Sequence, residues 1–155
     1  MLIMNTLATQ GPYSKGVFAI LAINSLFLIA NGLFMLADPK AWYLSIPGVK
    51  FTGGFNQHFI RDIGLIQLLL GVAFVVGMIR PAVRLELWAA ATIWLIAHSL
   101  FHFWEVAVGI CGPSTILRDF PGVTLPALIG IAATAWAYRI KMSPVRSGLG
   151  RPTAH

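Results

Sequence analysis

The run HFIRDIGLIQLLLGVAFVVGMI at residues 58–79, the basic loop RPAVR at 80–84 and a second apolar run at 85–108 decide the fold. Each run is long enough to cross the hydrocarbon core of a bilayer, which takes about 20 mostly apolar residues. Because backbone polar groups in lipid must be satisfied within their own segment, both runs are expected to be helices. The short loop between them makes the two helices an antiparallel pair.

Composition extends this prediction to the whole chain of 155 residues, of which 57% are hydrophobic and 10% charged. Soluble domains carry about 25% charged residues, so this composition excludes an ordinary soluble enzyme, a disordered chain and a nucleic-acid-binding module. Two further apolar runs flank the central pair. The sequence therefore predicts an all-α polytopic membrane protein, a four-transmembrane-helix bundle within residues 17–141 whose spans cover about 17–37, 58–79, 85–108 and 125–140.

Basic residues predict how the bundle is oriented. They occur in the loop at 80–84, in the tail after the fourth span and at Lys15 before the first span. Cytoplasmic loops carry an excess of Lys and Arg, so both termini are expected to be cytoplasmic. Residues 1–16 then form an N-terminal cytoplasmic segment, and residues 142–155, rich in Pro, Gly, Ser and Arg, form a disordered basic tail.

An internal repeat relates the two halves of the chain. The segment at 28–38, LIANGLFMLAD, aligns with 95–105, LIAHSLFHFWE, with five of eleven positions identical. Pro-Gly-Val also recurs, at 47–49 and 121–123. We interpret this as a duplicated helical hairpin whose halves are related by an axis along the membrane normal.

Polar side chains, which are costly inside a membrane, gather on single helical faces. His58, Arg61 and Asp62 are spaced i, i+3, i+4, and a second set on the third span is spaced i, i+4, i+7. Counting outward from the loop centre puts Asp62 level with His102 of that second set. The two polar faces are therefore expected to meet at one depth near the extracytoplasmic surface.

Imidazole nitrogens and carboxylate oxygens on facing helices suit a transition metal, namely Fe, Zn, Mn or Cu. The sequence predicts a metal-binding membrane protein, with a small oxidoreductase as one form of it; b-type haem is a less favoured cofactor. The expected metal ligands are His58, Asp62, His98, His102 and Glu105. Residues expected around the metal or at a substrate are Arg61, Asn31 and Asp38.

Two other functions fit the same residues. The polar layer suits a non-enzymatic scaffold or accessory subunit in which it only fixes helix packing, or a carrier of protons or a small solute. Arg118 and Asp119 are interpreted as a surface pair or as a cap over the site, and Cys111 as a free thiol or an intermolecular disulfide. The expected partners are the lipid bilayer and either further copies of the chain or a larger membrane complex, with no nucleic acid.

Several segments of the chain carry a family resemblance: Trp42-Tyr43, Pro47-Gly48-Val49, Phe55-Asn56-x-His58-Phe59-x-Arg61-Asp62-Ile63-Gly64 and, after His98, Phe101-His102-x-Trp104-Glu105. With them, most of the chain apart from its ends resembles a family of small four-span bacterial membrane proteins of uncharacterised activity. More distantly, its architecture is similar to that of the DoxX-like four-span proteins. The resemblance implies a multi-pass protein of the bacterial inner membrane and transfers no functional residue.

Overall fold

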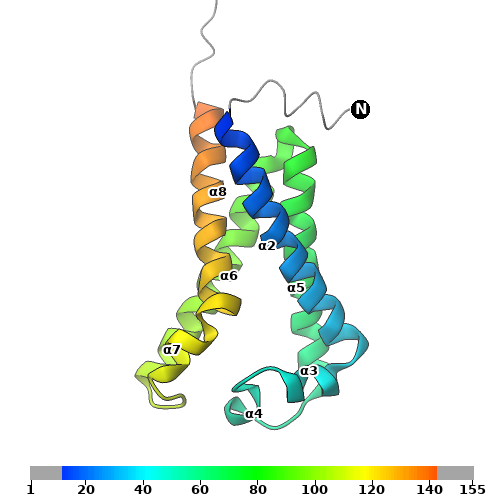
Figure 1. Cartoon of the computed structure of the whole chain (residues 1–155), viewed down its shortest axis with the longest axis vertical. Helices are drawn as coiled ribbons and strands as arrows, with labels where there is room; N and C mark the ends of the chain where they lie inside the picture. Colours follow the sequence, from blue (N-terminus) through cyan, green and yellow to red (C-terminus); the bar gives the residue numbers. More distant parts are fainter. Residues whose placement is uncertain (1–11, 143–155) are drawn as a thin grey trace, which may run out of the picture.

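The structure of the protein is a computed structural model that describes residues 12–142 (Figure 1). Every regular element in this part of the chain is helical. The long helices are α2 (Pro12–Ala37), α5 (Gln57–Ile79), α6 (Arg84–Ala107) and α8 (Leu125–Met142). The short connecting elements are α3 (Pro39–Ser45), α4 (Val49–Thr52), the 3₁₀ turn η1 (Pro81–Val83), α7 (Ser114–Asp119) and the π-helical turn η2 (Phe120–Thr124).

The predicted class is confirmed: the protein is an all-helical four-helix bundle of the multi-pass membrane type. Its four helices are long and apolar enough to cross a membrane. Helix α2 begins at Pro12 rather than at residue 17, and proline is well suited to the first turn of a helix. The fourth apolar stretch begins at Ser114, because α7 and η2 lead directly into α8. The rest of the predicted terminal segments, 1–11 and 143–155, lies outside the described residues.

Glycines bring α2 and α5 into close contact. A Cβ added at Gly32 would lie 2.6 Å from the carbonyl oxygen of Gly64, and one at Gly71 would lie 2.9 Å from that of Ser25. Backbones approach this closely in membrane bundles only where small residues line the interface. Gly64 and Gly71 therefore pack directly against α2, and this contact fixes which face of α5 turns toward α2.

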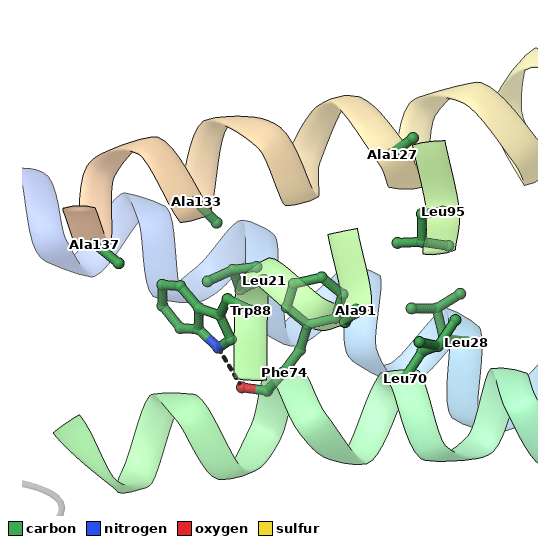
Figure 2. Packing of buried hydrophobic residues seen from close by; sticks show 10 residues of the cluster. All are labelled: Leu21, Leu28, Leu70, Phe74, Trp88, Ala91, Leu95, Ala127, Ala133 and Ala137. Carbon is green, nitrogen blue, oxygen red and sulfur yellow. Dashed lines mark hydrogen bonds between the residues drawn. The ribbon is translucent and has the colours of Figure 1, made fainter. Parts of the chain in front are cut away.

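The core lies nearest η1, where all four long helices meet (Figure 2). Phe74 and Trp88 are fully buried there, and the indole Nε1 of Trp88 donates to the Phe74 carbonyl at 3.0 Å. The Arg84 guanidinium lies over three aromatic rings, at 5.0 Å from Phe18, 5.4 Å from Trp88 and 5.6 Å from Trp136. Because cation–π contacts are stronger away from water, this cluster holds the two hairpins together at the η1 end.

Away from η1 the hairpin α2–α5 and the hairpin α6–α8 diverge (Figure 1). We call the end that carries α3, α4 and α7 the connector end. Both hairpins have the same order, a long helix, short helical connectors and a second long helix. This order supports the predicted duplication of a two-helix unit.

Candidate functional site

Two of the polar residues expected around a metal have structural partners instead. The Asn31 amide donates to Gln67 Oε1 at 2.9 Å, and its oxygen accepts from Trp42 Nε1 at 2.8 Å, so it joins α2, α3 and α5. Asp38 is the N-cap of α3 and accepts from the backbone N–H of Ala41 at 2.9 Å. Both side chains thus fix the turn between α2 and α3.

The polar group at the start of α5 points away from the bundle. Asn56 caps this helix by accepting from the backbone N–H groups of His58 and Phe59. His58 Nε2 lies 3.3 Å from Asp62 Oδ2, and their side chains are 87% and 54% exposed. His58 lies two residues before the buried Ile60, and Asp62 lies two residues before the buried Gly64. Two residues correspond to a rotation of about 200° around a helix, so both side chains lie on the side opposite the buried one. The glycine contact with α2 therefore turns this pair outward.

Arg61 lies beside the α2–α5 contact and does not reach the third span. Its Nε donates to the Leu36 carbonyl at 3.2 Å, and its Nη1 donates to Gln57 Oε1 at 3.0 Å. The carbonyls in the last turn of a helix lack partners within the helix, so the first of these bonds caps α2. Arg61 therefore acts as a local brace in the first hairpin.

The expected meeting of the two polar faces is not observed. Counting residues from the loop predicts the depth of each polar side chain in the membrane but not the side of the helix on which it lies. In addition, the halves of α5 and α6 away from η1 diverge (Figure 1). His58 consequently does not face His98 or His102 across a space for a metal or a haem. Among residues 12–142 no three His, Cys, Asp or Glu side chains are placed so that they could hold one metal ion.

The second predicted set does stay together on α6. The His98 ring stacks on Trp94 at 4.9 Å between centroids, and the His102 ring meets His98 edge-on at 4.8 Å. Glu105 lies one turn further along and is buried. These three side chains share one helix face, as their spacing predicted.

Asp119, which the sequence suggested only as a cap or surface residue, completes this group. His102 Nδ1 lies 3.3 Å from Asp119 Oδ2 and 3.9 Å from Glu105 Oε2. Arg118 binds the Asp119 carboxylate through two nitrogens, Nε at 2.7 Å and Nη2 at 3.2 Å. We call His102, Glu105, Arg118 and Asp119 the connector-end cluster.

The position of α7 explains why Asp119 reaches α6. After the turn at Gly109, which has a φ of +80°, the chain folds back as α7 and η2 beside the end of α6. Ser99 on α6 and Thr124 in η2 share a hydrogen bond of 3.2 Å across this contact. The only sequence signal for the approach of Asp119 was an Arg-Asp pair in a connector flanked by Gly and Pro.

The cluster opens into a small hollow between α6, α7 and η2. About 220 Å³ of open space adjoins it, including the part that is continuous with the surroundings. Its lining combines the polar His102 and Asp119 with apolar side chains. The lining residues are His102, Phe103, Val106, Thr115, Ile116, Asp119, Val123 and Thr124.

One residue of the cluster also contacts the first hairpin. A Cβ added at Gly48, between α3 and α4, would lie 2.1–2.3 Å from the guanidinium carbon and terminal nitrogens of Arg118. Gly48 has a φ of +92°, which side-chain-bearing residues rarely adopt. The cluster therefore adjoins a contact between the two hairpins at the connector end.

Charge balance in the cluster is incomplete. The cluster contains two carboxylates and one guanidinium, and both hydrogen bonds of that guanidinium go to Asp119. His102 Nδ1 is shielded from solvent and has no hydrogen-bond partner among the described residues. Glu105 therefore has no Lys or Arg partner among the described residues, although unpaired carboxylates are costly away from water.

Comparison with known proteins adds no further assignment, because the chain matches no known family model, no curated protein and no solved structure.

Proposed function

We propose that this protein is a cation-binding membrane protein and that the connector-end cluster is its site. The observation that carries the proposal is the placement of one imidazole nitrogen within 3.9 Å of two carboxylates, of which only that of Asp119 is paired with a guanidinium. With both carboxylates ionised and His102 neutral, the cluster carries a net charge of −1. One bound positive charge makes it neutral.

Two kinds of cation suit these donors. A proton can reside on His102 or Glu105 with the side chains as they lie. A divalent transition metal is also favoured by imidazole and carboxylate donors, and it would require Glu105 and Asp119 to turn toward a common point. Both belong to one proposal, because each places positive charge at the same atoms.

The contacts within the first hairpin support a site made of fewer residues than the sequence predicted. Asn31, Asp38 and Arg61 are engaged in helix caps and inter-helix hydrogen bonds. The proposal therefore assigns them to the scaffold, and it assigns the exposed pair of His58 and Asp62 no part in cation binding. His98 is placed beside the site, where it supports the His102 ring.

The test uses the full chain in lipid nanodiscs. Calorimetric titration with Zn²⁺ or Mn²⁺, run in buffers of different ionisation enthalpy, measures both metal binding and the protons released by it. His102→Ala is the test variant, and His58→Ala removes an imidazole from the other hairpin as the matched control. Binding lost in His102→Ala and kept in His58→Ala supports the metal form of the proposal.

A second arm measures the proton form. Infrared difference spectra across a pH titration report the carbonyl stretch of a protonated carboxyl group, which Glu105→Gln should remove or shift. If no metal binds but this signal is present and depends on His102, the cation is a proton. If neither metal binding nor a cluster-dependent protonation signal is found, the proposal is wrong.

A further inference from the structure

The segment that joins α2 to α5 exposes large apolar side chains. Phe51 is 74% exposed and Leu44 65%, Phe55 is also exposed, and Phe59 in the first turn of α5 is 62% exposed. Exposed apolar side chains gathered in one segment mark an interaction site on most proteins. Because the segment lies between two membrane spans, its natural surroundings are the boundary between lipid and water.

The same segment is held in a fixed shape. Tyr43 Oη donates to the Gly53 carbonyl at 2.8 Å, and the Tyr43 ring meets Phe55 edge-on at 5.5 Å between centroids. Trp42 is tied to Asn31 of α2 by its indole N–H. The exposed side chains therefore project from a braced unit, which makes the surface preorganised for a partner.

Its cationic side chains are free to meet anions. Neither Lys40 nor Lys50 forms an ion pair with any residue of the described chain, and the Lys50 ammonium lies 5.2 Å from the centre of the Phe51 ring. Lysine combined with exposed aromatic rings is typical of surfaces that lie in the headgroup layer, where the rings enter lipid and the ammonium meets phosphate.

We propose that the α3–α4 segment lies flat in the headgroup layer of one leaflet and binds anionic phospholipid headgroups through Lys40 and Lys50. Charge favours lipid over a second copy of the chain as the occupant. A symmetric dimer would bring the same patch of both copies together and set lysine against lysine. The inference does not depend on the cation site, since it uses none of the same residues.

The test places one reporter on this surface. Cys111 is the only cysteine in the sequence, so Cys111→Ser with Phe51→Cys allows a single nitroxide label at position 51. Collision with oxygen and with a water-soluble nickel chelate measures the depth of the label in nanodiscs of phosphatidylcholine, with or without phosphatidylglycerol. We expect headgroup-level depth, with less contact with the nickel chelate when phosphatidylglycerol is present.

Charge variants identify the binding groups. Replacing both lysines, Lys40→Gln with Lys50→Gln, should weaken the phosphatidylglycerol dependence about fivefold per lysine removed. Lys40→Arg with Lys50→Arg should retain it, and Lys15→Gln, the same charge change outside this segment, should leave the label unaffected. If the nickel chelate collides with the label as often as it would in bulk water, the inference is wrong. An unchanged lipid dependence in the double glutamine variant, or label–label broadening from a second copy, would also overturn it.

Discussion

At the scale of single residues, the sequence predicted which side chains are unusual but not what each one does. Asn31, Asp38 and Arg61 are polar groups in or next to apolar helices, which made them candidates for a site. Asn31 instead forms hydrogen bonds between helices, and Asp38 and Arg61 satisfy backbone groups at helix ends. Hydrogen-bond partners decide between these roles, and spacing along the chain does not specify them.

Gly48 gives the first residue-scale prediction. Its φ of +92° and the adjacent Arg118 guanidinium leave no room for a side chain. Gly48→Ala should therefore lower the free energy of unfolding by about 1–2 kcal/mol from backbone strain alone. Thermal unfolding in detergent measures the change. Gly53→Ala is the control, since its Cβ would meet nothing within 4 Å, and equal loss in both variants would contradict the account.

Arg84 gives the second residue-scale prediction. Its Nε donates to the Gly77 carbonyl at 2.9 Å and its Nη2 to the Met78 carbonyl at 3.3 Å, while its guanidinium lies over aromatic rings. Lysine cannot reproduce this planar arrangement, so Arg84→Lys should cost about 1–3 kcal/mol of unfolding free energy. Chemical unfolding curves provide the measurement. Arg80→Lys, on the exposed neighbouring residue, should be nearly neutral; a neutral Arg84→Lys would argue against a structural role.

At the scale of elements, the long helices were predictable and their directions were not. The runs at 58–79 and 85–108 match α5 and α6 within one residue at each end, because the length of an apolar run limits a span directly. The outward rotation of His58 and Asp62 depends on the glycine contact between α2 and α5, which lies in another part of the chain. Likewise, the approach of Asp119 to His102 depends on α7 folding back onto α6.

The glycine contact can be tested within one helix. A Cβ at Gly32 would lie 2.6 Å from the Gly64 oxygen, whereas one at Gly16 would meet nothing within 4 Å. Gly32→Ala should destabilise the protein by about 1–3 kcal/mol through overpacking. Gly16→Ala should be neutral or stabilise by up to about 1 kcal/mol, because alanine favours helix. Thermal stability of the two variants in the same detergent decides the point, and a tolerated Gly32→Ala would refute the close packing.

At the scale of the whole molecule, the two hairpins meet mainly at the η1 end, and each of the two Pro-Gly-Val turns also lies near a residue of the other hairpin. Gly48, in the first Pro-Gly-Val turn, meets Arg118 of the second hairpin. Gly122, in the second such turn, has Phe27 of the first hairpin 3.9 Å from its added Cβ. The partners of the two turns differ, so the duplication inferred from sequence rests on the recurrence of the turn and on the shared order of helices in the two hairpins.

The duplication also shows where the halves differ in chemistry. In the alignment Asn31 corresponds to His98, and Met35 to His102. In the first hairpin Asn31 forms a hydrogen bond between helices, and Met35 is a buried apolar residue. In the second hairpin the same positions carry His98 and its neighbour His102, which belongs to the connector-end cluster, so the proposed cation site belongs to one half of the bundle.

The most direct test of the central claim compares two aspartates. Asp119 belongs to the connector-end cluster and Asp62 does not, although sequence alone favoured Asp62 as a ligand. Cation uptake, as metal bound per chain or as the carboxyl protonation signal, should be lost or strongly weakened in Asp119→Asn and unchanged in Asp62→Asn. Uptake that survives Asp119→Asn and disappears in Asp62→Asn would contradict the proposed site.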